Sequence, residues 1–234
     1  MSAAVSAAIS ALVGAARILA LACALLGAAL ASACAGFHSS VQPDQTYYLR
    51  PHPAGAAGAG AAAAAPGSLR VGRPAASPGL DSARIMLVEA DHRMNFYAGS
   101  RWPGPAPQVI ESLAVATLRA SGAWSAVEDS SSPFPGDYLL GLVVRRFEAD
   151  YGAGGTAPVV QVALDCTLGR HAGREVIATF TASASAPAAA NRLGEVVAAF
   201  EQATDAALAS LAQQAAEAAR ADAQRTPPRP VSNP

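Results

Sequence analysis

The sequence contains no lysine, and all sixteen of its basic side chains are arginine. Without lysine the chain cannot form a Walker-A phosphate loop, a Schiff-base site or a Ser-Lys dyad. The formal net charge is −1, and the arginines form no basic cluster. Nucleic-acid binding depends on neutralising phosphates, and adhesion to anionic lipid depends on basic clusters. The composition therefore argues against a nucleic-acid partner and against purely electrostatic membrane binding.

Residue patterns typical of catalytic and metal sites are also absent. The four histidines lie far apart: His38, His52, His92 and His171. None has metal-ligand spacing to a cysteine or carboxylate, and no serine stands in a G-x-S-x-G elbow. Glu148 and Asp150 share one face of an expected strand, where paired carboxylates are usually solvated surface groups. We expect no metal, no cofactor and no enzymatic activity.

The N-terminal segment, residues 1–33, contains no acid and one base, Arg17. An apolar stretch at 18–30 follows, and it ends in Ala31-Ser32-Ala33. A basic start, a short apolar run and small residues before a cleavage point are typical of an export signal. The strongly apolar part is shorter than the roughly 20 residues of a membrane span. An uncleaved anchor that includes residues 3–16 is the alternative.

Cysteine is scarce, and cleavage after Ala33 would place one of the three cysteines, Cys34, at the new N-terminus. The sequence Leu30-Ala31-Ser32-Ala33-Cys34 resembles a bacterial lipobox, and this resemblance predicts acylation of Cys34. A lipobox usually has leucine three positions before the cysteine, where this sequence has Ala31. Ordinary secretion would cut the same bond without adding lipid. A disulfide between Cys34 and Cys166 is a third alternative in an oxidising compartment.

Composition divides the chain into four segments. Residues 1–33 form the predicted lipoprotein signal peptide. Residues 34–68 hold the lipidated cysteine, a flexible tether, a first short strand and a Gly/Ala-rich insertion at 55–66, which cannot bury enough surface to order itself. Residues 69–219 form one α+β domain. Residues 220–234, which include four prolines, are expected to be a disordered tail.

The central domain shows both helical and strand periodicity. Apolar residues at helical spacing predict helices at 108–120 and from 193 to at least 211. Alternation predicts strands at 84–90, 138–151, 159–168 and 175–185. Glycine-rich turns join the last three strands as hairpins. The expected fold is therefore α+β, a single antiparallel β-sheet covered on one face by two helices.

Alternation also predicts which side chains of the three long strands face the helices. In 159–168 the apolar set is Val160, Val162, Leu164, Cys166 and Leu168. In 175–185 it is Val176, Ala178 and Phe180. In 138–151 one phase holds Leu139, Val143, Phe147 and Tyr151, and the other holds Leu142, Val144 and Arg146. Cys166 is expected to be a buried, inert thiol.

One aromatic segment has two interpretations. Residues 95–103 place Tyr97, Arg101 and Trp102 immediately before the first helix. The aromatic rings could fill the junction between sheet and helix. Alternatively, Tyr97, Arg101 and Trp102 form a partner-binding surface, since these residue types are enriched at interface hot spots.

The order of these features resembles that of the ABC-type transport auxiliary lipoproteins, the PqiC-like family. The segments that carry the resemblance are the lipobox-like cysteine, "TYYLRP", "RIMLVEA", "YAGSRWPGPAPQVIESLAVATLRASGAWSAVE", "DYLLGLVVRRFEADY" and the closing helix. The resemblance covers Cys34 to Leu211. It carries no catalytic residues that could be transferred to this chain.

The resemblance implies an outer-membrane lipoprotein that faces the periplasm. Its implied partners are an inner-membrane ABC transporter and a mammalian-cell-entry (MCE) protein, in a system that moves lipids between membranes. A different hypothesis is a soluble periplasmic domain that binds lipid or peptide between its helices and sheet. The open edges of a one-layer sheet also leave self-association into a homo-oligomer as an expectation.

Overall fold

The computed structural model describes residues 43–50, 67–152, 156–172 and 174–225, and every structural statement below concerns these residues. The chain divides into Met1–Pro43 and Asp44–Pro234, and the fold described here belongs to the second unit. The predicted signal peptide, Cys34, the Gly/Ala-rich stretch at 55–66 and the end of the tail lie outside the described residues.

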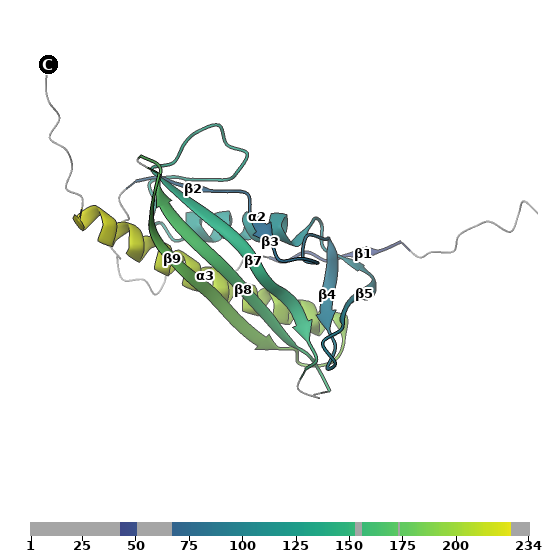
Figure 1. The fold of residues 1–234 in the computed structure, drawn as a ribbon. Helices are drawn as coiled ribbons and strands as arrows, with labels where there is room; N and C mark the ends of the chain where they lie inside the picture. Colours follow the sequence, from purple (N-terminus) through teal and green to yellow (C-terminus); the bar gives the residue numbers. More distant parts are fainter. Residues whose placement is uncertain (1–42, 51–66, 153–155, 173, 226–234) are drawn as a thin grey trace, which may run out of the picture. The chain divides into compact units, whose positions relative to one another are not determined.

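Three long strands dominate the sheet (Figure 1). They are β7 (Tyr138–Asp150), β8 (Val159–Arg170) and β9 (Glu175–Pro187), and they pair antiparallel in chain order. The other strands of the described residues are short: β1 (Gln45–Thr46), β2 (Leu69–Val71), β3 (Ala75–Ala76), β4 (Arg84–Val88), β5 (Met94–Arg101) and β6 (Val127–Glu128). The predicted meander is thus confirmed, and it forms one side of a larger sheet, in which the short strands lie beyond β7 and β9 forms the opposite edge.

The sheet is mixed rather than wholly antiparallel. Strands β2, β3 and β4 pair one after another with the edge of β7 that faces away from β8, and each is parallel to β7. The pairs β1–β5 and β2–β6 are also parallel, whereas β4 and β5 form an antiparallel hairpin. The predicted antiparallel pairing is confirmed for most of the sheet, but the short strands beside β7 run parallel to it, since a 13-residue strand is long enough to pair with several short segments in turn.

Two helices in the described part of the chain, α2 (Ala106–Ala120) and α3 (Leu193–Arg225), lie on the same side of the sheet (Figure 1). The start of α2 holds a proline in its first turn, and Gly122 follows its end with φ +63°, a left-handed conformation that glycine adopts without strain. Neither helix is both long and apolar enough to span a membrane. The predicted α+β class with two helices is confirmed.

The closing helix is longer than predicted. It continues to Arg225, so the prediction of a disordered tail was wrong for residues 220–225. Small residues at helical spacing keep one side of α3 buried as far as Ala219, and Asp222 in the last turns is only 4% exposed. A buried ion pair formed by that carboxylate stabilises this end of the helix against the sheet, as described below.

The core lies between the two helices and the sheet. Its largest fully buried side chains are Trp102, Phe147, Phe200, Leu69, Ile85, Ile110, Leu118, Leu140, Leu164, Leu168, Leu208 and Leu211. The rings of Trp102, Phe147 and Phe200 contact one another, with centroids 4.9–5.6 Å apart. Side chains fill the space where the soluble-domain hypothesis placed a lipid or peptide.

Two β-bulges decide which side chains face the core. Arg145 is an extra residue in β7, because Val144 pairs with Leu164 while Arg146 pairs with Ala163. Leu142 and Val144 before the bulge and Phe147 after it all face the core, although they belong to different predicted phases. In β8, the predicted inward set from Val160 to Leu168 is confirmed.

The second bulge lies between β8 and β9. Leu168 pairs with Ala178 and Gly169 with Val176, so Ile177 is the extra residue. The alternation of β9 therefore shifts by one position at Ile177. The prediction that Val176 faces inward was wrong: its side chain is 60% exposed, on the side of the sheet away from the helices.

Candidate functional site

The three residues predicted to bind a partner do not share one surface. Trp102 is fully buried in the aromatic cluster with Phe147 and Phe200, so the packing interpretation holds for it. Tyr97 is half-buried, and its hydroxyl lies 2.9 Å from that of Tyr151. Burial and this hydrogen bond raise the pKa of Tyr97 above its ordinary value. Of the three predicted residues, Arg101 alone is exposed.

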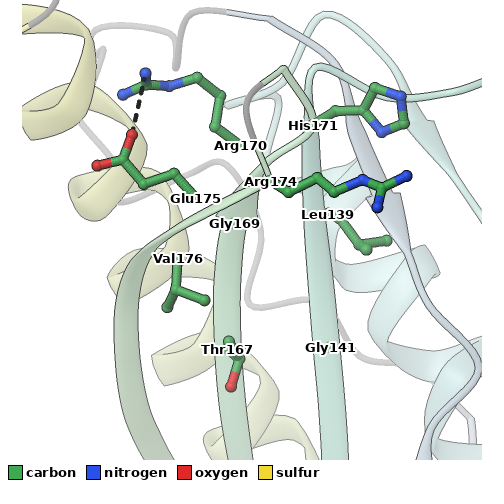
Figure 2. A pocket seen from close by; sticks show the side chains of 9 residues that line it. All are labelled: Leu139, Gly141, Thr167, Gly169, Arg170, His171, Arg174, Glu175 and Val176. Atoms are coloured by element: carbon green, nitrogen blue, oxygen red, sulfur yellow. Dashed lines mark ion pairs between the residues drawn. The ribbon is translucent and has the colours of Figure 1, made fainter.

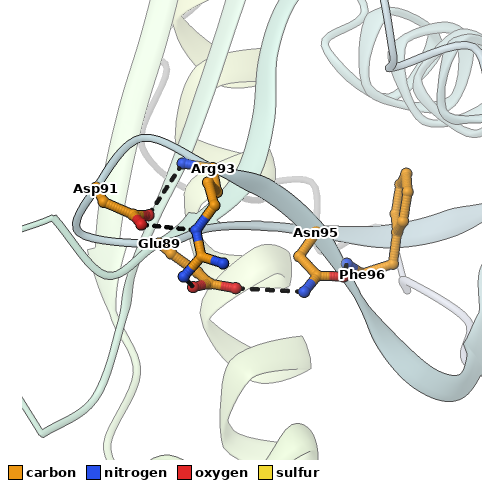
Figure 3. A network of polar contacts seen from close by, with 5 residues as sticks. All are labelled: Glu89, Asp91, Arg93, Asn95 and Phe96. Carbon is orange, nitrogen blue, oxygen red and sulfur yellow. Dashed lines mark hydrogen bonds and ion pairs between the residues drawn. The ribbon is translucent and has the colours of Figure 1, made fainter.

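The hairpin between β4 and β5 carries a small charged network (Figure 3). The guanidinium of Arg93 lies 2.6 Å from an oxygen of Asp91 and 2.7 Å from one of Glu89, and Asn95 donates to Glu89 at 3.2 Å. The hydrogen bond from Arg93 lowers the pKa of the Asp91 carboxyl. Both carboxylates already have a cationic partner, so the network closes a turn rather than forming an open acid–base site.

The paired carboxylates of β7 are neutralised in the same way. Arg146 contacts Glu148 at 2.6 Å and Asp150 at 2.9 Å. Glu148 is 8% exposed and its two oxygens accept bonds from its own strand. This arrangement is a structural ion pair. The described residues hold no group of three or more His, Cys, Asp or Glu side chains that could bind a metal.

Cys166 lies in the core, 2% exposed. Burial raises the pKa of its thiol to about 12, so the reactive thiolate is scarce at neutral pH. Within the part of the chain that the structure describes, it is a free cysteine. Its geometry suits packing and gives no support to nucleophilic chemistry.

A groove of about 480 Å³ lies on the open face of the sheet, opposite the helices, near the turn between β8 and β9 (Figure 2). It is lined by Leu139, Gly141, Thr167, Gly169, Arg170, His171, Arg174, Glu175 and Val176. Its volume lies within the range of small-molecule sites, roughly 300–1,000 Å³. Leu139 and Val176 are two of the few large apolar side chains exposed on the described residues, at 44% and 60%.

Strand register explains the shape of the groove. Leu139, Gly169 and Val176 are direct partners across β7, β8 and β9, so they form one row on the open face. Gly169 lacks a side chain, so none stands between the two apolar walls, and a Cβ there would lie 3.2 Å from the backbone carbonyl oxygen of Glu175. Gly141, the partner of Thr167 in the next row, continues the floor. A Cβ at Gly141 would meet nothing closer than 3.7 Å, so there is space above this position.

Charged residues gather at one end of the groove and form two sets. On the side of α3, Arg170 donates from Nε to Asp222 at 3.1 Å and also contacts the second oxygen of that carboxylate. Arg170 also lies 3.5 Å from Glu175. On the side of β7, Figure 2 shows Arg174 reaching over Leu139, with His171 beyond it. In the first set one guanidinium faces two carboxylates, so that set supplies no excess positive charge; on the β7 side the guanidinium of Arg174 supplies one.

Sequence reasoning missed this groove for two identifiable reasons. Strict alternation predicts that Val176 faces inward. The bulge at Ile177 shifts the alternation by one residue, so the Val176 side chain lies on the open face. The sequence also predicts that Asp222 belongs to the disordered tail, whereas the structure pairs this residue with Arg170. The available signal was the pair of glycines, Gly141 and Gly169, since glycine inside a strand often marks a bulge or a site of close approach.

Comparisons with known proteins identify the family. A family model described as "ABC-type transport auxiliary lipoprotein component" matches residues 47–216. A comparison with curated proteins finds no match. Among solved structures, a protein of family-model DUF330 from Xanthomonas campestris is similar with 27% identity and a TM-score of 0.64, over 80% of this chain and 99% of that one.

A second solved structure, described only as an uncharacterized protein, has the same fold. It is 16% identical with a TM-score of 0.56, over 74% of this chain and 99% of that one. The family match spans β2 to β9, α2 and most of α3, which is well over half of the chain. This chain therefore belongs to the family of ABC-type transport auxiliary lipoprotein components.

Proposed function

We propose that this protein is a non-catalytic lipoprotein, anchored to the outer membrane through acylated Cys34, that serves an ABC/MCE-type system moving lipids between membranes. The observation that carries the proposal is the family match over residues 47–216. The lipobox-like sequence precedes the matched residues along the chain, so an anchor at Cys34 would leave the folded part free to face the periplasm.

The anchor and the domain are joined by a short segment. Triacylation would hold the chain stably, because several acyl chains bind a membrane far more strongly than one. Ten residues lie between Cys34 and the start of β1, and a flexible coil of that length would reach about 18 Å. Leu49 is buried in the domain and the backbone N–H of Arg50 donates to Glu201 at 2.9 Å, so the tether ends at a fixed point on the fold.

The described side chains support a binding role rather than a catalytic one. Glu148, Asp150, Glu89 and Asp91 each have a cationic partner, and the thiol of Cys166 is buried. The groove on the open face presents apolar walls and the guanidinium of Arg174, which suits recognition. Self-association remains part of the proposal, since β9 is an edge strand that pairs with β8 alone among the strands the structure describes.

Co-purification tests the proposal. The full chain, with an affinity tag at its C-terminus, would be extracted from native membranes in a mild detergent. We expect an MCE-domain protein and components of an inner-membrane ABC transporter to be recovered with it. Recovery of the tagged chain alone, from membranes in which those proteins are shown to be intact, would contradict the proposal.

Cys34→Ser is the matched control for the anchor. This variant keeps the whole domain but cannot be acylated, so we expect it to lose stable attachment to the outer membrane. Retention of Cys34→Ser in outer-membrane fractions at the wild-type level would show that the anchor is not a lipid on this cysteine.

The alternative of a soluble periplasmic lipid- or peptide-binding domain keeps one observation in its favour, which is the groove on the open face. It differs in predicting a mature chain that is released by breaking the outer membrane open, without detergent. Release into the soluble fraction would favour it over the anchored protein.

A further inference from the structure

We propose that the groove binds a single-chain anionic amphiphile: one acyl chain lies between Leu139 and Val176, and its monoanionic headgroup pairs with Arg174. The biological meaning of this inference rests on the proposed role in lipid transport. Its physical basis is separate, because it depends on the shape and charge of one surface.

The slot has the width of one hydrocarbon chain. Neighbouring strands lie about 4.8 Å apart, so Leu139 on β7 and Val176 on β9 flank Gly169 with roughly 10 Å between their Cα atoms. Their side chains narrow this gap, and Gly169 places no side chain between them. Covering these two exposed walls with an acyl chain removes apolar surface from water, which is favourable in proportion to the area buried.

A peptide strand would lack its usual recognition mode in this slot. Strand addition needs a sheet edge with free backbone donors and acceptors. The floor of the groove belongs to β8, which pairs on both sides, with β7 and with β9. Polar recognition is therefore left to side chains, and an apolar chain needs no backbone partner.

Charge at the end of the slot selects the headgroup. Arg170 is held by Asp222 and Glu175 on the side of α3, while Arg174 extends over Leu139 on the other side (Figure 2). Among the described residues, Arg174 has no ion pair within 4 Å. A guanidinium pairs with a carboxylate or phosphate through two parallel hydrogen bonds. One such cation suits one negative charge.

Photocrosslinking in membranes tests this inference on the full chain. The probe is a 16-carbon fatty acid that carries a diazirine, and mass spectrometry of peptides locates the crosslinks. We expect crosslinks beside Leu139 on β7 and Val176 on β9. Excess palmitate or lysophosphatidylglycerol should compete, and the stronger of the two distinguishes a carboxylate from a phosphate headgroup. Hexadecanol is neutral and cannot form the charge-assisted contact, so about a tenfold higher concentration of it should be needed for the same loss of crosslinking.

Two variants with matched controls separate the headgroup contact from the apolar slot. Arg174→Gln should lower the crosslinking yield about tenfold, whereas Arg73→Gln, at an exposed arginine outside the groove, should leave it unchanged. Val176→Glu should abolish crosslinking in the groove. Met94→Glu alters an apolar side chain of similar exposure, 53%, on the β4–β5 hairpin and should have no effect.

Several results would overturn the inference. They are crosslinks that fall outside the groove, equal competition by hexadecanol and palmitate, or wild-type yield in Arg174→Gln. A further contradicting result would be a Val176→Glu variant that still crosslinks to the fatty-acid probe but no longer retains a bound protein or a second copy of the chain. The groove would then be a protein-docking surface. The proposed function fails separately, through loss of co-purification with crosslinking intact.

Discussion

The two faces of the sheet follow different rules, although the same three strands form both. The face toward α2 and α3 is closed by large apolar side chains such as Leu140, Leu164 and Phe200, all fully buried. The opposite face is mostly polar, and its exposed apolar residues, Leu139 and Val176, border the groove. The covered face stabilises the fold, while the open face carries the groove for which we propose a ligand. The predictions below test that division.

Neighbouring leucines on β7 provide the largest contrast. Leu140 is fully buried and Leu139 is 44% exposed. We expect Leu140→Ala to lower the free energy of unfolding by about 2–5 kcal/mol, through lost burial and a cavity. Leu139→Ala should change it by less than about 1 kcal/mol. Urea unfolding followed by the fluorescence of the two buried tryptophans, Trp102 and Trp124, measures both. Equal losses would remove the distinction between the faces.

The ion pair between Arg170 and Asp222 is the next largest effect. Asp222→Asn removes the buried negative charge that pairs with Arg170, and we expect a loss of about 2–3 kcal/mol. The expected loss lies at or below the lower end of the range for breaking a buried ion pair, because the Arg170 side chain is 25% exposed. Glu217→Gln, an exposed carboxylate on the same helix, is the control and should stay within about 0.5 kcal/mol of wild type. Similar values for both variants would show that the end of α3 contributes little.

A smaller, pH-dependent effect is expected where β7 begins. Hydrogen bonds from the backbone N–H and hydroxyl of Ser68 hold the pKa of Asp137 below its usual value. Because the folded state has the lower pKa, this stabilisation is present above the unfolded value, about 3.9, and is lost as pH falls through the folded value. Stability measured from pH 6 to pH 2 should therefore fall less steeply in Asp137→Asn than in wild type. Identical slopes would contradict this.

Thiol labelling compares the two faces without a large change in stability. Cys166 should resist a maleimide in the folded protein and react after unfolding, since its thiol is buried and its pKa is raised. A Leu139→Cys variant places a thiol on the open face and should react in the folded state. Peptide mapping distinguishes the two positions. Rapid labelling of Cys166 in the folded protein would indicate that the core opens.

The covered face could be predicted from sequence more completely than the open one. Strict alternation in β8 identified the inward residues from Val160 to Leu168, because no bulge interrupts them before Gly169. It failed across Arg145 and Ile177, where one extra residue exchanges the faces. A bulge depends on how two strands align in space, which the sequence of one strand does not state.

The candidate site was harder to predict for the same reason. The groove brings together Leu139, Arg174 and Val176 from different strands, and its charge balance depends on Asp222, which is distant in sequence. Individual residue types pointed instead to Trp102, an interface residue by composition, which the structure places in the core. Residue type predicted burial correctly for Cys166, where alternation and chemistry agreed.

The intact mass of the protein extracted from native membranes tests the central claim, that this is a lipoprotein anchored at Cys34, most directly. We predict a mass that corresponds to a chain beginning at Cys34 with acyl chains added. A mass that retains residues 1–33, or that matches a chain beginning at Cys34 without lipid, would contradict the claim.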